Sequence, residues 1–369
     1  MGDDRLIETF LDLVRIDSPS GSESAVAQYC AARLRAAGCD VWFDDSASRT
    51  GADTGNLFAR LSGRGSGRVV LSAHMDCVQP CVGVEPVLVD DTITSVGETV
   101  LGADDKAGIA AILESVERVV AGVGVYPEIL VVLTVSEEPG LIGAKAVDLG
   151  LLQADICLVL DADGPAGGIV TGAPTHHTFE AAFLGMAAHA GVAPEQGVSA
   201  LLMAARSIAE MRLGRLDEMT TANIGSIDSG TATNVVPARA VMTGECRSRD
   251  DGRAQAIRDE MDGLMRESAA REGGTVEIVW THQYTGFDFP DDHPAVTLVA
   301  DACREAGVVP RLFKTGGGSD GNVFSAAGVP TLVLSCGMQS VHSVDECLDV
   351  RDLHALVDII AAVMNRLAV

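Results

Sequence analysis

Histidine and acidic residues recur directly after short apolar segments along this chain of 369 residues. The first apolar run, 68–71, leads into Ser72-Ala73-His74-Met75-Asp76. Later segments repeat this order in LGADDK, SEE, LDAD and VHS, whose ionisable residues are Asp104, Asp105, Glu137, Glu138, Asp161, Asp163 and His342. Imidazole and carboxylate groups are the ordinary ligands of zinc and similar ions. The pattern therefore predicts one divalent-metal site.

A shared position after strand-like runs makes the set more informative than any of its members. Alone, His74 is typical of a hydrogen-bonded core histidine, and Glu137-Glu138 of a solvated helix start. In an open α/β sheet, however, the carboxyl ends of the strands meet in one crevice. So many carboxylates in one crevice cost free energy unless a cation balances them. Two histidines and several acids can hold two ions, and Asp104 is the natural bridge.

The elements that must position these residues alternate between helix and strand. Apolar spacing predicts helices over 4–16 and 23–37, and then alternating elements over 69–73, 106–120, 129–135 and 156–160. Such alternation is typical of an α/β fold, with a mostly parallel sheet covered by helices on both faces.

The sequence pattern changes near residues 167–174. The following residues predict a compact α+β unit with an antiparallel sheet, built from strands over 178–185, 222–228, 238–245 and 276–281 and helices over 198–211 and 253–271. The α/β pattern then returns with elements over 295–306, 331–335 and 350–367. We therefore expect a catalytic, metal-binding domain formed by residues 1–172 and 286–369, and an inserted domain formed by residues 173–285.

Composition narrows the classes of partner. The 52 acidic and 26 basic residues give a formal charge of −26, which repels phosphate backbones and anionic lipid, so we expect neither nucleic acid nor membrane as a partner. No apolar run reaches membrane-spanning length, and the acidic start does not resemble a secretory signal. The nine cysteines lack paired CxxC spacing and predict buried, reduced thiols, including Cys77 and Cys81. A soluble, cytoplasmic protein is expected.

As a set, the motifs AHMD, LGADDKAG, SEEPGLIGAK, LDADG and VHSVDE resemble those of the co-catalytic zinc exopeptidases. That family includes peptidase T, acetylornithine deacetylase and succinyl-diaminopimelate desuccinylase, and the peptidase T branch is the most similar. The resemblance spans essentially the whole chain. It implies a zinc exopeptidase-like catalytic domain and an inserted ferredoxin-like domain that serves as a lid and in dimerisation.

The resemblance also implies two divalent metal ions per subunit, zinc in the first place and cobalt or manganese as alternatives. By position, His74 and Asp161 would bind one ion, Glu138 and His342 would bind the other, and Asp104 would bridge both.

Two further acids receive roles from the same resemblance. Asp76 would fix the tautomer and orientation of His74, as a ligating imidazole requires. Glu137 would be the general base that activates a metal-bridging water and later passes the proton to the leaving amine.

Neighbouring acids leave two ligand positions open. Asp105 could take the place of Asp104, and Asp163 that of Asp161, because a shift of one or two residues in a loop is invisible from spacing. We expect Lys106 to pair locally with an acid rather than to contact substrate.

The inserted domain contributes further candidates. In the resembled family, the residue that matches His189 reaches the active site of a neighbouring subunit and helps to stabilise the oxyanion, which implies a homodimer here. Asn234 and Arg247 lie where that family presents an Asn and an Arg to substrate. Arg suits carboxylates because its planar fork pairs bidentately, although a surface ion pair explains Arg247 equally well.

A glycine turn at 316–321, including Gly317, could present amides to an anion. His176 and His177 are expected to be structural.

The leading hypothesis is a dinuclear zinc metallopeptidase that hydrolyses an amide bond in short peptides, a peptidase T-like exopeptidase of the tripeptide aminopeptidase type. One alternative is an N-acyl amino-acid deacylase or carboxypeptidase, which would bind a free carboxylate through Arg247 or the glycine turn. A second alternative is a non-catalytic metal-binding scaffold. A two-metal phosphoesterase is disfavoured, because this chain has few basic residues near the motifs to bind phosphate. The sequence leaves the substrate side chain, the terminus recognised and the physiological metal open.

Overall fold

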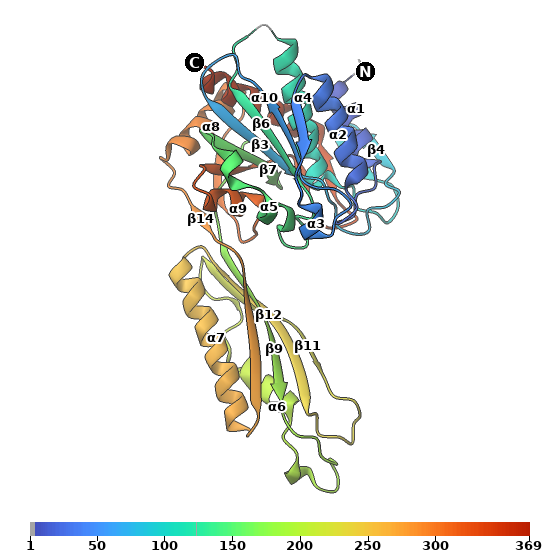
Figure 1. The fold of residues 1–369 in the computed structure, drawn as a ribbon, viewed down its shortest axis with the longest axis vertical. Helices are drawn as coiled ribbons and strands as arrows, with labels where there is room; N and C mark the ends of the chain where they lie inside the picture. Colours follow the sequence, from blue (N-terminus) through green and yellow to red (C-terminus); the bar gives the residue numbers. More distant parts are fainter. Residues whose placement is uncertain (1–3, 123) are drawn as a thin grey trace. The chain divides into compact units, whose positions relative to one another are not determined.

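A computed structural model describes residues 4–122 and 124–369 (Figure 1). The chain forms two compact units. Unit 1 comprises residues up to Thr171 together with Phe289–Lys314 and Ser319–Val369, and unit 2 comprises Gly172–Asp288 and Thr315–Gly318. The inserted segment therefore extends to 288 rather than 285, and the short piece 315–318 was not anticipated from the sequence.

A nine-stranded sheet has most of its strands in unit 1, whereas β14 and the last residues of β8 fall within 172–288. Its strand order is β1-β2-β6-β3-β7-β16-β8-β14, with β15 paired to β8. The strands are β1 (Asp40–Phe43), β2 (Leu57–Leu61), β3 (Arg68–His74), β6 (Glu128–Thr134), β7 (Ile156–Ala162), β8 (Gly168–Ala173), β14 (Phe287–Asp288), β15 (Arg311–Lys314) and β16 (Thr331–Ser335).

The four inner strands of this sheet are parallel, whereas its outer pairs are antiparallel. Strand β3 pairs in parallel with β6 and β7, and β7 pairs in parallel with β16. The register places His74 beside Thr134, so the last residue of β3 lies at the same edge as the end of β6. This arrangement confirms the predicted α/β class, with a mainly parallel central sheet.

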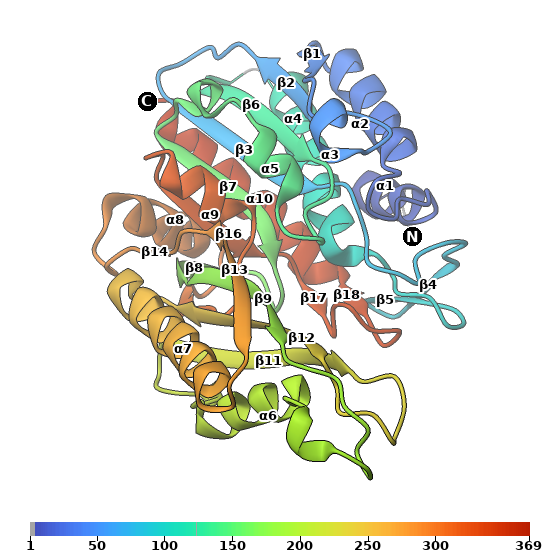
Figure 2. The ribbon, with the colours of Figure 1, turned by 60° about the horizontal axis from the view of Figure 1, so that its bottom comes forward.

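Helices cover both faces of the sheet (Figure 2). Alternate residues of the inner strands, such as Val69 and Leu71, belong to the large core with α4 (Ala103–Ala121) and α10 (Val350–Leu367). Thr134, of the opposite parity at the end of β6, is hydrogen-bonded to Asp320 of α9 (Asp320–Ala326), and this helix also contacts β7 and β16. The remaining helices of unit 1 are α1 (Arg5–Val14), α2 (Ser24–Ala36), α3 (Ala47–Thr50), α5 (Ile142–Ala146), η1 (Leu149–Leu152) and α8 (Pro294–Glu305).

Unit 1 also contains a small sheet that the apolar periodicity did not predict. Its strands, in the order β17-β18-β5-β4, are β4 (Pro86–Val89), β5 (Thr92–Ser95), β17 (Met338–Gln339) and β18 (Cys347–Asp349). The strands are two to four residues long, too short to show a period in sequence. The loop between β17 and β18 carries His342.

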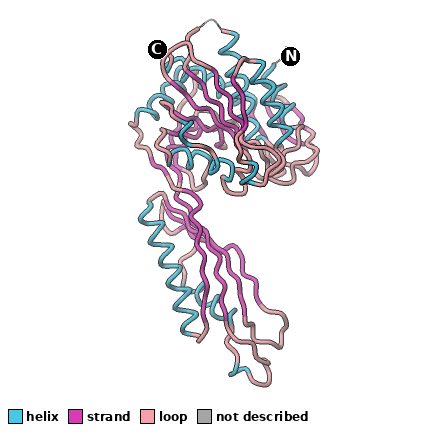
Figure 3. The backbone as a smooth tube through the Cα atoms, in the orientation of Figure 1, coloured by secondary structure: helices cyan, strands magenta, loops and turns pink. Residues whose placement is uncertain are grey.

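Unit 2 is an antiparallel sheet with two helices on one face, as the pattern predicted. Figure 3 shows its strands as long extended segments beside the two helices. The order is β10-β11-β12-β9-β13. The elements are β9 (Thr175–Leu184), η2 (Pro194–Gln196), α6 (Ala200–Glu210), β10 (Gly214–Arg215), β11 (Thr220–Ser229), β12 (Arg239–Ser248), α7 (Asp251–Arg271) and β13 (Thr275–Tyr284).

Alternation along β9 separates the two faces of this sheet. Phe179, Ala181 and Phe183 belong to the core that α6 and α7 cover, whereas Glu180 is exposed on the other face. A period of two residues is what a sheet with one covered face requires.

Two findings bear on the predicted environment of the protein. No helix among the residues with a described structure is long and apolar enough to cross a membrane. All nine cysteines are unpaired, and eight of them are buried. Burial raises the pKa of the Cys77 thiol to about 11, so this side chain packs as a neutral group, as expected from the sequence.

Candidate metal centre

Two histidines from distant parts of the chain meet at one carboxylate. His74 ends β3, and its Nε2 lies 3.0 Å from Oδ1 of Asp104. His342 follows β17, and its Nε2 lies 3.1 Å from Oδ2 of the same side chain. Asp104 is the second residue of α4 and has non-helical backbone angles. Its two oxygens thus face two different imidazoles.

A further acid accompanies each histidine. Oδ1 of Asp161, near the end of β7, lies 3.7 Å from His74 Nε2. Oε1 of Glu138 lies 3.1 Å from His342 Nε2, yet this buried oxygen accepts no hydrogen bond of good geometry. A buried carboxylate oxygen without a donor is the environment that a cation would satisfy. The donor set of imidazole and carboxylate atoms fits zinc or a similar divalent ion.

Charge pairing shapes the protonation of this cluster. Pairing with Asp104 and then with Glu138 raises the pKa of His342 to about 10. Burial acts to raise the pKa of Asp104, but the hydrogen bonds from His342 and His74 outweigh it and hold that pKa below its usual range. Burial, followed by the charge of Asp104, raises the pKa of Asp161 well above the ordinary value. The protons that His342 and Asp161 hold are those that a bound cation would replace.

The structure distinguishes the neighbouring acids. Asp105 is fully buried, and its two oxygens accept the backbone N–H groups of His74 (3.2 Å) and Gly108 (3.2 Å). It also lies within 4.8 Å of ligand atoms of His74 and Asp161. We nevertheless favour Asp104 as the bridge, because both Asp105 oxygens already serve the backbone. Asp163 is exposed beyond β7, whereas Asp161 lies in the cluster.

Asp76 contacts several parts of the centre at once. Its backbone carbonyl lies 2.9 Å from His74 Nδ1, and its carboxylate oxygen Oδ1 lies 3.4 Å from the same atom. The carbonyl is therefore the closer acceptor for the ring N–H, which leaves Nε2 free to bind a metal. The carboxylate accepts hydrogen bonds from the backbone N–H groups of Glu137 (2.9 Å) and Glu138 (3.3 Å).

Glu137 immediately precedes a candidate ligand and is only 8% exposed. Burial is the largest influence on its pKa and raises it well above the ordinary value; His74 opposes this rise, and Asp320 and Glu138 add to it. A carboxylate whose proton affinity is raised in this way is suited to take a proton from water.

Sequence reasoning missed one residue of the centre. Glu346 is 1% exposed, and its carboxylate accepts hydrogen bonds from the backbone N–H groups of Gly102 (2.7 Å) and Asp104 (3.0 Å). It stands in the motif VHSVDE, four residues after His342, and that position was the available signal. The prediction that Lys106 pairs with an acid is wrong, because its buried ammonium donates instead to the Ile16 carbonyl at 2.7 Å.

In unit 2, the loops that carry His189 and Asn234 are joined. Ala190 N donates to the Asn234 carbonyl (2.9 Å), and His189 forms an isolated bridge with Val235. His189 is exposed, and its Nδ1 accepts the Gly191 N–H (3.1 Å). Without the family resemblance, the side chain would look like a turn histidine.

Arg247 is engaged by neighbours within unit 2. Its Nη2 lies 2.9 Å and its Nε 3.2 Å from the carboxylate of Glu245, while Nη1 lies 3.5 Å from the Tyr284 hydroxyl. His176 also contacts Glu245, at 2.8 Å. The N–H of Gly317 donates to Thr315 Oγ1 (3.0 Å), so this amide already has an acceptor within the turn.

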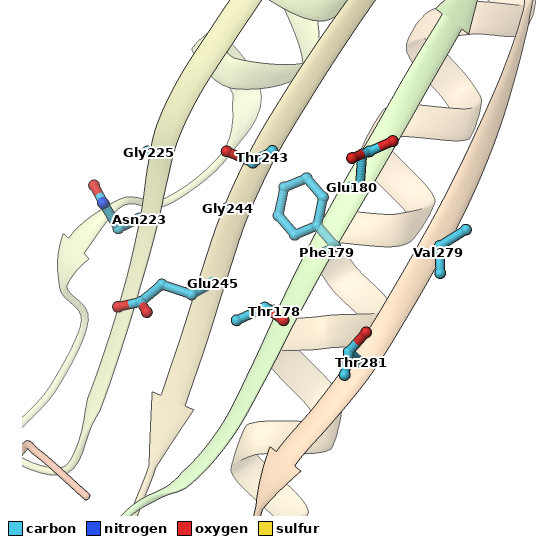
Figure 4. A pocket seen from close by; sticks show the side chains of 10 residues that line it. All are labelled: Thr178, Phe179, Glu180, Asn223, Gly225, Thr243, Gly244, Glu245, Val279 and Thr281. Atoms are coloured by element: carbon cyan, nitrogen blue, oxygen red, sulfur yellow. The ribbon is translucent and has the colours of Figure 1, made fainter. Parts of the chain in front are cut away.

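A hollow on the open face of the unit 2 sheet offers a different kind of surface (Figure 4). Its lining comes from β9, β11, β12 and β13, and Glu180 and Glu245 are its ionisable members. None of the residues that line it is a histidine. It therefore lacks the donor set of the cluster in unit 1.

Comparison with known proteins identifies a family and several similar proteins. The model of the peptidase family M20/M25/M40 matches residues 70–366. The YqjE protein of Bacillus subtilis is 37% identical over 365 residues, which cover 99% of this chain and 98% of YqjE.

Two solved structures are similar over nearly their whole length. One is the aminopeptidase PepT from Bacillus cereus, with a TM-score of 0.94, 36% identity and 99% of each chain covered. The other is a tripeptidase from Staphylococcus aureus, with a TM-score of 0.95 and 35% identity, covering 100% of this chain and 99% of that one.

Proposed function

The chain belongs to the peptidase family M20/M25/M40, and from that premise we propose that it hydrolyses an amide bond in short peptides with two divalent metal ions. As a member of a peptidase family it is a hydrolase. Zinc is the proposed metal, with cobalt and manganese as alternatives. The proposed cleavage is that of a peptidase T-like exopeptidase, a tripeptide aminopeptidase.

The observation that carries the proposal is the double contact of Asp104. Its two oxygens lie 3.0 Å from His74 Nε2 and 3.1 Å from His342 Nε2. Each histidine has one further acid beside it, Asp161 or Glu138. This supports one ion at each histidine, with Asp104 bridging the two.

Within the centre, Glu137 supplies the proton transfer. Two divalent cations would lower the pKa of water and polarise the scissile carbonyl. The Glu137 carboxylate takes one proton from the attacking water and delivers it to the amine that leaves when the C–N bond breaks. The Asp76 carboxylate accepts the backbone N–H of Glu137, and the Asp76 carbonyl fixes the His74 ring. Burial of Glu137 keeps bulk water from competing for that proton.

The proposal includes recognition of the amino-terminal end of the peptide. The aminopeptidase PepT and the tripeptidase share the fold along their full length, which supports action on short peptides with a free amino group. The alternative is an N-acyl amino-acid deacylase or carboxypeptidase, which would hold a free carboxylate through Arg247. Because Glu245 already accepts hydrogen bonds from the Nε and Nη2 atoms of that guanidinium, such a carboxylate would have to use the remaining donors or displace Glu245.

A matched substrate set tests the proposal. The metal-depleted protein is incubated with zinc, cobalt or manganese and with a free tripeptide, its N-acetylated form and its C-terminal amide. We expect metal-dependent hydrolysis of the free tripeptide and of the amide, and little of the acetylated form. Preference for the acetylated form would favour the deacylase. Metal binding without turnover of any substrate would favour the non-catalytic scaffold.

We propose in addition that unit 2 is a lid and dimerisation domain, and that His189 completes the active site of a second copy. The exposed position of His189 supports this role. Mixing inactive His189→Ala and Glu137→Gln chains, followed by subunit exchange, should restore about a quarter of the parent activity, because half of the dimers then hold one intact site. Absence of restored activity in proven mixed dimers would exclude action in trans.

We also propose a cytoplasmic location. Nine unpaired thiols are typical of proteins in a reducing compartment. Fractionation of cells that produce the protein checks this, and recovery outside the cytoplasm would contradict it.

A further inference from the structure

A buried carboxylate outside the proposed ligand set faces the turn that carries Glu137. Glu23, directly before α2, is 0% exposed. Its Oε1 accepts hydrogen bonds from the Gly21 N–H (2.8 Å), the Ser136 N–H (3.0 Å) and the Ser136 hydroxyl (3.1 Å). The other oxygen, Oε2, is buried without a hydrogen-bond partner. Burial of such a group is costly unless its interactions compensate.

Helix capping does not explain this position. Glu23 occupies the N-cap site of α2, yet its side chain makes no capping hydrogen bond. The N–H of Ser24 is instead bound by Asp53 Oδ1 at 2.9 Å. The Glu23 side chain is directed to Ser136, which is 113 residues away in the sequence.

Ser136 has a backbone conformation that needs support. Its φ of 50° lies in the left-handed region, which costs a residue other than glycine on the order of 1 kcal/mol. Glu23 binds both donors of this residue, its N–H and its hydroxyl. The chain leaves β6 at Thr134 and must turn at Ser136 before Glu137 can enter the centre.

Two buried carboxylates together hold three consecutive amides. Glu23 binds the N–H of Ser136, and Asp76 binds those of Glu137 (2.9 Å) and Glu138 (3.3 Å). The hydroxyl of Ser20, three residues before Glu23, donates to Asp76 Oδ2 at 2.6 Å. The segment between α1 and α2 therefore reaches both ends of the turn.

We propose that Glu23 is a positioning residue for Glu137, the proposed base: by fixing Ser136 it sets the direction in which the Glu137 carboxylate points. This inference rests on the proposed function. Glu23 acts through the backbone of the turn and contacts neither substrate nor the reacting atoms. Loss of its two bonds to Ser136 frees the turn at the side opposite Asp76, so the base is less often aligned with its water.

The first test compares Glu23→Ala, Glu23→Gln and Asp53→Ala in the full chain. We expect Glu23→Ala to lower kcat by about 10–100-fold, the range for residues that orient a catalytic group, with KM and bound metal nearly unchanged. Glu23→Gln should recover activity to within about threefold of the parent, because its amide oxygen accepts the same bonds. Asp53→Ala alters the same helix start without touching Ser136 and should leave kcat near that of the parent.

A second measurement does not depend on turnover. Amide hydrogen exchange should become at least about tenfold faster at Ser136–Glu138 in Glu23→Ala but not in Asp53→Ala, since only the former loses the acceptor. Ser136→Ala, which removes the hydroxyl donor alone, should lower kcat by a smaller factor. It also serves as the test variant if Glu23→Ala does not fold.

The outcomes separate the two proposals. If the parent shows no metal-dependent peptide hydrolysis, the proposed function fails, while the exchange rates still decide whether Glu23 holds the turn. An unchanged kcat in Glu23→Ala, or a loss that merely follows loss of metal, would overturn the positioning role. The positioning role would also be overturned if Glu23→Ala lowered kcat by the same factor in a Glu137→Gln background as in the parent. A residue that acts through Glu137 has no effect once that base is gone.

Discussion

The backbone N–H of Asp104 donates a 3.0 Å hydrogen bond to Oε1 of Glu346, a buried side chain 242 residues further along the chain. The other oxygen of Glu346 accepts the N–H of Gly102 at 2.7 Å. One carboxylate thus holds both ends of the short segment that directs the Asp104 side chain between the two histidines. The proposed bridging ligand depends on a residue that no spacing rule pairs with it.

We therefore expect Glu346→Ala to weaken metal binding by about 10–100-fold, as is usual for residues that orient a ligand. The Asp104 segment loses its two anchors, while all the ligands remain. Titration calorimetry of the metal-depleted protein measures the effect. Asp345→Ala alters an exposed neighbour and is the control. Equal affinities for Glu346→Ala and the parent would contradict this role.

Replacement of the proposed base should separate chemistry from metal binding. Glu137→Gln keeps the size of the side chain but cannot accept the proton from water, so we expect kcat to fall by about 10²–10⁴-fold. Metal content by elemental analysis should stay the same. A kcat close to that of the parent would show that another group is the base.

Metal removal should lower stability as well as activity. The centre brings Asp104, Asp161, Glu138 and two histidines together, and a cation that binds the folded state alone stabilises it by mass action. At a free concentration of 1,000 times Kd, the gain is about 4 kcal/mol. Thermal unfolding with and without zinc measures it, and identical melting temperatures would indicate that no ion binds the folded chain.

A glycine in unit 2 provides a packing test that is independent of the metal. A Cβ at Gly318 would lie 2.3 Å from Cζ of the Tyr284 ring, whereas a Cβ at Gly316 would meet nothing within 4 Å. Gly318→Ala should therefore lower the free energy of unfolding by about 1–3 kcal/mol. Gly316→Ala in the same turn should have little effect. Urea denaturation of both variants measures the difference, and equal midpoints would contradict the contact.

Acid should remove one contribution to the stability of unit 2. The hydrogen bond with His176, followed by that with Arg247, lowers the pKa of Glu245 from 4.5 to about 2. A depressed pKa in the folded state stabilises the fold above the unfolded value, and this contribution is lost as the pH falls from about 4.5 towards 2. Because Glu245 is half-buried, solvent screening reduces the contribution of its interactions to the free energy of unfolding to about 1 kcal/mol.

Glu245→Gln removes this titration. Melting temperatures of parent and variant should therefore differ near neutral pH and converge as the solution is acidified. A difference that stays constant across this range would show that the ion pair does not contribute.

The main elements could be predicted because their residues carry a period. The alternation of β9 and the apolar spacing of α10, which begins at Val350 and ends at Leu367 as predicted, follow from the need to bury one face. The small sheet of β4, β5, β17 and β18 could not be predicted, since its strands are too short to show a pattern and form only where the chain folds back.

The candidate ligands could also be predicted, because each follows a buried strand or stands in a motif of the family. Their partners could not. Glu346 and Glu23 bind backbone N–H groups far away in sequence, and a hydrogen bond to the backbone leaves no trace in the identity of the residue that donates it. Lys106 illustrates the same limit, since its acceptor is the Ile16 carbonyl.

The sequence by itself determined the kinds of atom available for chemistry and the edge of the sheet at which they gather. It could do so because strand periodicity and residue type are local properties. Only the tertiary structure decided that the oxygens of Asp104 face His74 and His342 while those of Asp105 turn to the backbone. Adjacent acids have the same chemistry, and the direction of each carboxylate is set by backbone angles and by hydrogen bonds from distant segments.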